Sequence, residues 1–268
     1  MRTSLTYTTH SPIGIFDSGL GGLSICKEIV TLLPNESVIY LADSINAPYG
    51  EKSKEEIIRL SIKNTELLLA LGCKIIVVAC NTATTNAISV LREKYNVPFI
   101  GIEPATKPAA LKTQTGIIGV LATKGTLKSE LFLSTSSQFR HQLEIIEVEG
   151  KNLVRLIEEG KMDDTIPLLK KYLLPMVNKG ADNIVLGCTH YPFLIPIIEQ
   201  IIPTNIKIID SGEAVAKQTR EILKVNKLIN DKKIKASYVF YTNKSVDILS
   251  NFLKRINLKA TKVAFKNF

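Results

Sequence analysis

Short runs of apolar residues alternate with longer amphipathic segments along the chain. The short runs are rich in valine, isoleucine and leucine, which is typical of strands buried on both faces of a parallel sheet. They are segments 13–16, 38–42, 75–79, 98–102, 117–121, 143–148, 183–186 and 207–209. Because helical patterns separate them, the sequence predicts an α/β fold with mostly parallel sheets and helices on both faces.

The clearest predicted helix follows Ser53. The run Ser53-Lys54-Glu55-Glu56 has the capping-box pattern, and Gly72 is a typical stop signal. A weak internal echo links segment 14–19 with segment 116–123, because each opens a unit that precedes one cysteine-bearing strand. We therefore expect two pseudo-symmetric, doubly wound domains, although repeated strand–helix construction alone also produces such an echo.

Length and composition narrow the class of protein. The chain has 268 residues, 45% of them hydrophobic, enough to bury a sizeable core in one large or two smaller domains. The first ten residues lack the apolar stretch of a signal peptide, and no segment approaches the ~20 apolar residues of a membrane span. The sequence therefore predicts a cytoplasmic protein with no membrane partner.

The formal net charge of +9 is unevenly distributed. From Lys217 onward there are 13 Lys and Arg residues against three acidic ones. Such a region attracts nucleic acid or an anionic substrate, but it is also typical of a solvated, lysine-rich surface. No aromatic interleaving or nucleic-acid motif accompanies the charges, so we do not expect nucleic acid as the main partner.

Two of the four cysteines stand at the ends of apolar runs in similar contexts. Cys80 follows Val-Val-Ala and precedes Asn-Thr, while Cys188 follows Val-Leu-Gly and precedes Thr-His-Tyr-Pro. Parallel α/β sheets place ligands at the carboxyl ends of their strands, so both thiols are expected at a binding site. Residues 81, 82 and 192 suit helix starts, which predicts a lowered thiol pKa. By contrast, Cys26 and Cys73 fit small buried hydrophobes.

The cysteines do not suggest a metal or a disulfide framework, because there is no C-x-x-C pair and the chain has only three histidines. Two loops accompany the thiols at the predicted sheet edge. Segment 17–22, Asp-Ser-Gly-Leu-Gly-Gly, offers backbone amides to an anion, although it is neither a dinucleotide fingerprint nor a P-loop. Segment 47–50, Ala-Pro-Tyr-Gly, reads as an ordinary turn or as a wall of the pocket.

Paired thiols at one carbon suit the inversion of a stereocentre. One thiolate removes the α-proton and the opposite thiol returns a proton to the other face, with no redox cofactor. Donors around the substrate carboxylate must stabilise the carbanion, and the amides of segment 17–22 are the candidates. His190, two residues after Cys188, is a credible acid–base partner.

Together these motifs resemble the glutamate racemases of the cofactor-independent aspartate/glutamate racemase superfamily. The resemblance extends from about residue 13 to residue 216 through several ordered motifs. It implies a bacterial cytoplasmic enzyme that interconverts L- and D-glutamate, supplies D-glutamate for peptidoglycan and often forms dimers. It also implies a first domain of residues 1–101 and 212–268 that carries Cys80, a second of residues 102–211 that carries Cys188, and an active site between them.

The resemblance assigns roles to matching positions. Cys80 and Cys188 are the proton-transfer residues, and Asp17 and His190 assist them. The residues expected to hold the substrate are Asp17, Ser18, Tyr49, Gly50, Asn81, Thr82, Thr189 and His190.

One segment departs from the family pattern. Where many relatives have an Ala-Cys-Pro run, an apolar stretch and a glutamate, this chain has Glu149-Gly150-Lys151, an apolar stretch and Glu158. Glu158 is thus the candidate for the family glutamate near His190, on a loose alignment. Two other functions remain open: an aspartate racemase of the same superfamily, and a non-catalytic binding protein that uses the basic C-terminal region.

Overall fold

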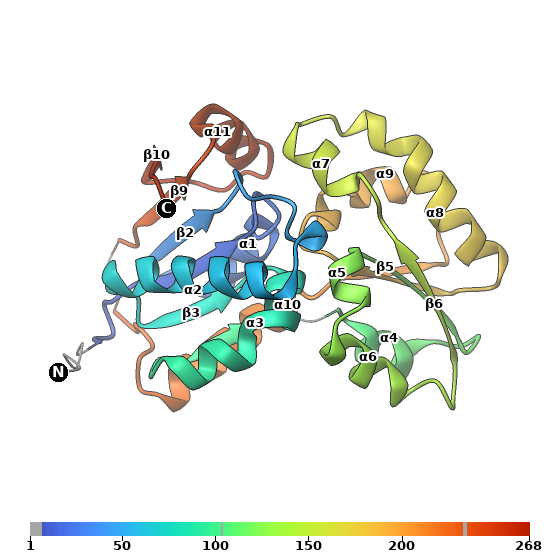
Figure 1. Cartoon of the computed structure of the whole chain (residues 1–268), viewed down its shortest axis with the longest axis horizontal. Helices are drawn as coiled ribbons and strands as arrows, with labels where there is room; N and C mark the ends of the chain where they lie inside the picture. Colours follow the sequence, from blue (N-terminus) through green and yellow to red (C-terminus); the bar gives the residue numbers. More distant parts are fainter. Residues whose placement is uncertain (1–6, 103, 233–234) are drawn as a thin grey trace.

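The computed structural model describes residues 7–102, 104–232 and 235–268. Within these residues, the strands form one six-stranded and one four-stranded sheet, and every strand pair is parallel. Figure 1 shows the two sheets as two halves of the molecule, each with its own helices. The α/β class predicted from the apolar runs is confirmed.

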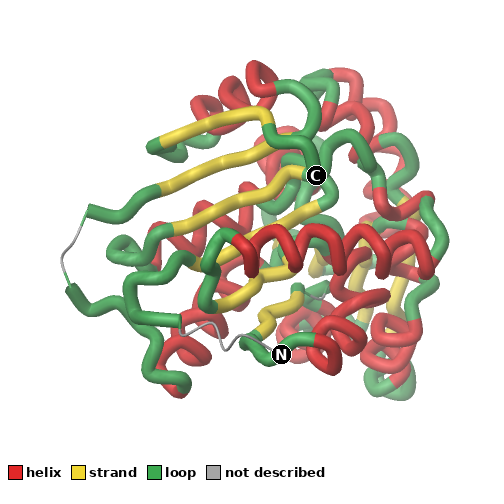
Figure 2. The backbone as a smooth tube through the Cα atoms, turned by 60° about the vertical axis from the view of Figure 1, so that its left-hand side comes forward, coloured by secondary structure: helices red, strands yellow, loops and turns green. Residues whose placement is uncertain are grey.

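The larger sheet has the order β10-β9-β2-β1-β3-β4. Its strands are β1 (Ile13–Asp17), β2 (Val38–Ala42), β3 (Ile75–Val78), β4 (Phe99–Gly101), β9 (Tyr238–Thr242) and β10 (Lys262–Phe265). Figure 2 shows these strands running side by side between layers of helices.

The smaller sheet has the order β6-β5-β7-β8. Its strands are β5 (Ile117–Ala122), β6 (Glu144–Glu149), β7 (Asn183–Gly187) and β8 (Lys207–Ile209). The run β2-β1-β3-β4 in the larger sheet repeats this order, so the two halves are pseudo-symmetric. All eight predicted strands are present, and sequence reasoning missed β9 and β10.

Alternating side chains explain why helices cover both faces of the larger sheet. Ile13 and Ile15 of β1 pack in the core formed with α1 (Leu23–Leu32) and α10 (Gly212–Val225), whereas Phe16 packs in the core with α2 (Lys54–Ala70) and α3 (Asn81–Lys94). Both faces of a central parallel strand are therefore apolar, as the continuous hydrophobic runs indicate. A further helix, α11 (Val246–Arg255), lies against β9 and β10.

Shorter helices dominate the second half. They are α4 (Thr106–Lys112), α5 (Lys124–Leu127), α6 (Glu130–Ser137), α7 (Leu153–Glu158), α8 (Ile166–Asn178) and α9 (Ile195–Ile198). Three 3₁₀ turns complete the fold: η1 (Tyr49–Glu51), η2 (Asp163–Thr165) and η3 (Tyr191–Leu194). Pro192 lies in the first turn of η3, so the helical segment predicted after Cys188 begins as a 3₁₀ turn.

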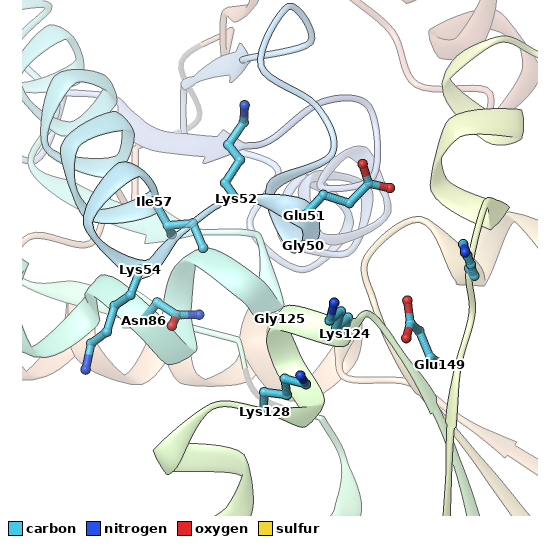
Figure 3. A pocket seen from close by; sticks show the side chains of 11 residues that line it. Gly50, Glu51, Lys52, Lys54, Ile57, Asn86, Lys124, Gly125, Lys128 and Glu149 are labelled. Atoms are coloured by element: carbon cyan, nitrogen blue, oxygen red, sulfur yellow. The ribbon is translucent and has the colours of Figure 1, made fainter.

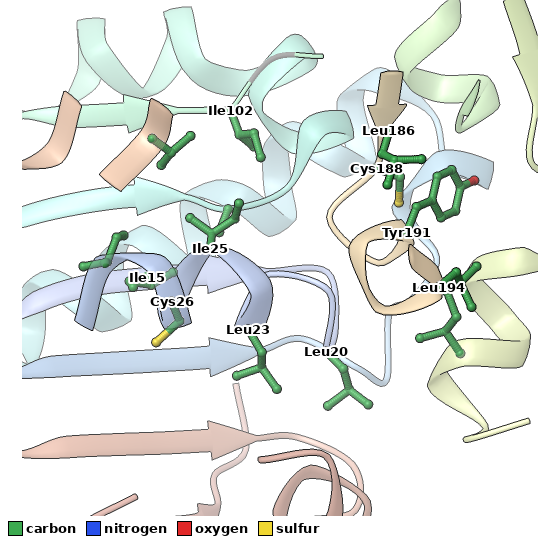
Figure 4. Close-up of a cluster of buried hydrophobic side chains, with 14 of the residues drawn as sticks. Ile15, Leu20, Leu23, Ile25, Cys26, Ile102, Leu186, Cys188, Tyr191 and Leu194 are labelled. Atoms are coloured by element: carbon green, nitrogen blue, oxygen red, sulfur yellow. The ribbon is translucent and has the colours of Figure 1, made fainter. Parts of the chain in front are cut away.

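One hydrophobic core is continuous between the halves. It runs from Ile15 and Leu23, beside the larger sheet, to Leu186, Tyr191 and Leu194, beside the smaller one (Figure 4). The two halves thus share one hydrophobic core next to the carboxyl ends of their central strands. The predicted domain boundaries at residues 101/102 and 211/212 stay a prediction, and residues 1–6, 103 and 233–234 lie outside the described part.

Local signals at α2 match the sequence. Ser53 caps the helix, since its hydroxyl accepts a hydrogen bond from the amide of Glu56 at 3.2 Å. Gly72 ends it with a φ of 80°, a left-handed conformation that glycine adopts without strain. Every helix in the described residues is too short or too polar to traverse a lipid bilayer.

Candidate active site

The two thiols singled out in the sequence lie in one buried region between the sheets. Cys80 follows β3 and Cys188 follows β7, so each stands at the carboxyl end of a central strand. Their relative exposures are 5% and 6%, and they are close enough to interact electrostatically. Both cysteines are therefore almost fully buried.

Cys80 is itself the N-cap of α3. Its sulfur accepts a hydrogen bond from the amide of Ala83 at 3.4 Å and lies 3.7 Å from the hydroxyl of Ser18. The prediction that Asn81 and Thr82 supply the cap is wrong, because both residues already belong to the helix. The predicted lowering of the thiol pKa is also wrong for Cys80: burial, reinforced by the charge of Asp17, raises it well above its ordinary value.

Asp17 ends β1 and is fully buried. Its Oδ2 accepts hydrogen bonds from the amides of Gly19 at 3.1 Å and Gly22 at 3.0 Å, and its Oδ1 accepts one from the Thr189 hydroxyl at 3.4 Å. Burial raises the pKa of Asp17, and the neighbouring His190 opposes that shift. The segment 17–22 thus folds around its own carboxylate.

This arrangement corrects the expected role of the loop amides. The amides of Gly19 and Gly22 are bonded to Asp17, and that of Leu20 donates to Glu158 Oε1 at 2.5 Å. They bind protein carboxylates and are not free donors for a substrate anion.

The second thiol belongs to a chain of polar contacts. Cys188 Sγ lies 3.8 Å from His190 Nδ1, and His190 Nε2 lies 2.7 Å from Glu158 Oε1. Burial lowers the pKa of His190, but the hydrogen bonds to Cys188 and Glu158 outweigh it and raise the pKa well above its ordinary value. Glu158, which the sequence reached only through a loose alignment, is therefore in direct contact with His190.

The buried side chain of Asn81 offers unpaired polar atoms beside Cys80. Its side chain is 3% exposed, and among the described residues neither its Oδ1 nor its Nδ2 has a hydrogen-bond partner. A buried amide without partners costs several kcal/mol, on the order of ~1–3 per group, unless something binds it. Since Asn81 follows Cys80 directly, the orphan amide belongs to the thiol region.

The other candidate residues border the same region. Tyr49 directs its hydroxyl at Asp43 Oδ2, 2.5 Å away, which fixes the turn that contains Gly50. A Cβ on Gly50 would come within 2.9 Å of Thr123, so the two halves touch there.

Two residues that the sequence did not single out join the site from β5 and α5. Thr82 Oγ1 lies 2.8 Å from Thr123 Oγ1 and 3.3 Å from Thr126 Oγ1. In the sequence, both threonines lie in segment 119–126, Gly-Val-Leu-Ala-Thr-Lys-Gly-Thr, which follows an apolar run as the cysteine motifs do.

The structure thus brings all the candidate residues to the region between the facing strand ends: Asp17, Ser18, Tyr49, Gly50, Cys80, Asn81, Thr82, Glu158, Cys188, Thr189 and His190. Among the described residues, no cluster of three or more His, Cys, Asp or Glu side chains has a metal-binding arrangement.

A family model described as Asp/Glu/Hydantoin racemase matches residues 13–219, more than half of the chain. The chain belongs to this racemase family. Curated relatives called glutamate racemase include one from Ectopseudomonas mendocina, 47% identical over 82% of this chain and 85% of its own, and one from Herpetosiphon aurantiacus, 43% identical over 87% and 92%. The chain is thus an amino-acid racemase.

Solved structures agree with this assignment. Glutamate racemase isoform RacE1 from Bacillus anthracis has a TM-score of 0.85 at 31% identity, covering 97% of this chain and 98% of that one. The Escherichia coli glutamate racemase, solved in complex with L-glutamate and the activator UDP-MurNAc-ala, has a TM-score of 0.83 at 34% identity, covering 95% and 98%. An aspartate racemase from Picrophilus torridus, 18% identical with a TM-score of 0.53, shares the fold.

Proposed function

We propose that this racemase interconverts L- and D-glutamate by proton transfer at two cysteines. The arrangement of Cys80 and Cys188 carries the proposal: they terminate corresponding strands of two pseudo-symmetric sheets and enter one buried region. Each thiol has its own polar partners, Asp17 and Ser18 beside Cys80, and His190 beside Cys188. The relatives called glutamate racemase support glutamate as the substrate.

The reaction is a balanced exchange of protons. A thiolate on one side removes the α-proton, its sulfur becomes a thiol, and the electron pair stays on the α-carbon. The opposite thiol then donates its proton to the other face and becomes a thiolate, and the roles exchange in the reverse direction. Two general acid–base groups suffice, so we expect no redox cofactor.

The buried charges suit these roles. The raised pKa of Cys80 keeps a transferable proton on that thiol. On the other side, the raised pKa of His190 keeps a positive charge 3.8 Å from Cys188, and Glu158 holds the ring through its other nitrogen. The two sulfurs therefore have different ionisable neighbours, Asp17 beside Cys80 and His190 beside Cys188.

We assign substrate binding to the polar groups beside the thiols. Asn81 has a free donor and a free acceptor, which match the carboxylate and the ammonium group of an amino acid. The hydroxyls of Ser18, Thr82 and Thr189 surround the same region, and the turn at Tyr49 and Gly50 closes it. Asp17 and His190 adjoin the substrate as well as the thiols.

The cellular role follows from the resemblance. We propose a cytoplasmic enzyme whose D-glutamate supplies peptidoglycan, and hence cell wall biogenesis and cell shape, and that acts as a homodimer.

Isotope exchange tests the mechanism. The purified protein is incubated with L-glutamate in D₂O, and the α-proton signal is followed by NMR in the native protein and in Cys80→Ser and Cys188→Ser variants. We expect exchange with formation of D-glutamate in the native protein and loss of racemisation in both variants. A variant that retains near-native turnover would contradict the two-thiol mechanism.

The same assay separates the alternatives. Exchange with aspartate and none with glutamate would indicate an aspartate racemase. Salt-sensitive DNA binding without any α-proton exchange would favour the non-catalytic binding protein.

A further inference from the structure

A second cavity, outside the thiol region, opens between the two halves beside Gly50 (Figure 3). Its volume is about 470 Å³, within the range of ~300–1,000 Å³ typical of small-molecule sites. Its charged lining comes from both halves: Glu51, Lys52 and Lys54 from the first, and Lys124, Lys128, Glu149 and Lys151 from the second.

The charge of this cavity is unbalanced. Five lysines face two glutamates, which leaves a surplus of three positive charges. Only Lys54 has a carboxylate within 4.0 Å, that of Glu130, and in the described ranges the other four ammonium groups have none at that distance. Within the described residues the two lining glutamates offset only part of this positive charge, so the cavity attracts anions.

The cavity lies beside the helix that begins at Cys80. Gly50 and Gly125 both line it, and a Cβ on Gly125 would come within 3.2 Å of the Gly50 backbone and 2.9 Å of Thr82. Thr82 lies two residues beyond Cys80 and hydrogen-bonds to Thr123 from the other half. The cavity lining at Gly125 thus contacts Thr82, two residues from Cys80 along the chain.

The segment that departs from the family pattern helps to build this cavity. Glu149 and Lys151 line it, and Gly150 between them is held against Tyr191. The Tyr191 hydroxyl donates to the Gly150 carbonyl at 3.2 Å, and a Cβ at residue 150 would come within 2.3 Å of that hydroxyl oxygen. Since Tyr191 follows His190 in the chain, this contact links Gly150 to the segment after β7, and Lys151 is the next residue after Gly150.

We propose that this lysine-lined cavity captures the carboxylates of the acidic substrate before it enters the thiol region. The inference rests on the proposed function and adds a binding site outside the reacting groups. The positive potential of the five lining lysines raises the local concentration of an anion in the cavity. Because the Debye length is ~8 Å at physiological salt, these lysines act on a substrate in the cavity, whereas lysines elsewhere on the surface are screened.

The test compares two charge-matched triple variants. In the first, Lys124, Lys128 and Lys151 are changed to glutamine. In the control, Lys170, Lys171 and Lys207, which are exposed and lie outside the cavity, are changed to glutamine. Both lower the net charge by three, so a difference between them reports the place of the charges and not their sum.

We expect a position-specific, salt-dependent effect. At about 10 mM ionic strength, where the Debye length is ~30 Å, kcat/KM for glutamate falls about three- to tenfold in the cavity variant relative to the control, with kcat within about twofold of the native value. Near 1 M salt, where the Debye length is ~3 Å, the difference shrinks to less than about twofold. Equal kcat/KM values in both variants at low salt would overturn the inference.

A second measurement uses inorganic phosphate as a probe that is not a substrate. At low salt we expect phosphate to compete with glutamate in the native enzyme and in the control variant, and to inhibit the cavity variant at least about threefold more weakly. Equal inhibition of all three would also refute capture at these lysines. A native enzyme that does not racemise glutamate would instead refute the proposed function, so the two failures are distinguishable.

Discussion

Replacing Glu158 by glutamine removes the negative charge beside His190 and retains the shape of the side chain. Glu158 accepts hydrogen bonds from the Leu20 amide at 2.5 Å and the Ser44 hydroxyl at 3.2 Å, and it contacts His190 at 2.7 Å. A glutamine oxygen at the Oε1 position still accepts from the Leu20 amide, and the glutamine NH2 at the Oε2 position donates to the Ser44 hydroxyl, which then acts as the acceptor. The substitution therefore isolates the charged contact to the imidazole.

The size of the effect follows from that contact. A hydrogen bond to a charged group contributes ~1.5–3 kcal/mol, and one pKa unit corresponds to 1.36 kcal/mol. We therefore expect Glu158→Gln to lower the pKa of His190 by about one to two units. The acidic form of His190 is then lost at lower pH, and the corresponding limb of the kcat/KM profile shifts by the same amount.

Proton NMR of the histidine rings measures this directly, because the chain has only three histidines. His10 and His141 are exposed, and glutamine variants of each assign their signals. Glu159→Gln is a matched control, since Glu159 is the next residue and pairs with Lys161 at 2.7 Å. An unchanged His190 pKa in Glu158→Gln, or an equal shift in the control, would refute the reasoning.

The same variant has a defined effect on stability. A histidine whose pKa is raised by folding stabilises the protein fully below its unfolded value of ~6.5, and this stabilisation is lost as the pH rises through the folded pKa. The loss of unfolding free energy in Glu158→Gln should therefore be largest near pH 6 and should shrink at alkaline pH. Urea unfolding at several pH values checks this sign, and a loss that grows with pH would contradict it.

Three further substitutions test individual contacts. Lys74→Met should cost ~3–5 kcal/mol in urea unfolding, because it leaves the buried carboxylate of Glu36, 2.6 Å from Lys74 Nζ, without its cationic partner; the double variant with Glu36→Leu should recover the part of the loss that comes from this unpaired charge. Asn81→Ala should raise KM without lowering the melting temperature, because both polar atoms of the side chain lack hydrogen-bond partners within the described protein, and a lower melting temperature would contradict this. Gly150→Ala should cost ~1–3 kcal/mol in unfolding free energy through the clash with Tyr191, and native stability would show that the contact yields.

The strands were predictable where burial on both faces leaves a continuous apolar run. β1 and β3 are of this kind, and so are the cysteine-bearing strand ends. β9, Tyr238-Val-Phe-Tyr-Thr242, was not predicted although it is rich in strand-forming residues, because it is a short run within a lysine-rich region. β9 lies between the edge strand β10 and β2, and three of its five residues are partly exposed, so its hydrophobic pattern is weaker.

The candidate residues were predictable where they lie at the end of a strand or within three residues beyond it, as Asp17, Cys80 and His190 do. Contacts between distant segments were not, because no local pattern encodes them. The pairing of Glu158 with His190 joins the end of α7 to the residues after β7, and Thr123 reaches Thr82 across the two sheets. The lysine-lined cavity likewise arises from four separate segments.

The Cys80 thiol shows why a local signal gave the wrong sign. A helix N-terminus stabilises a nearby negative charge by ~0.3–1 kcal/mol, up to ~2 in favourable geometry, and here it provides one amide contact at 3.4 Å. Full burial shifts a pKa by up to ~3–5 units, or ~4–7 kcal/mol, and the buried Asp17 adds a like charge. Desolvation therefore dominates and favours the thiol form of Cys80. In the proposed reaction the ammonium group of the substrate brings a compensating positive charge, so formation of the Cys80 thiolate is coupled to substrate binding.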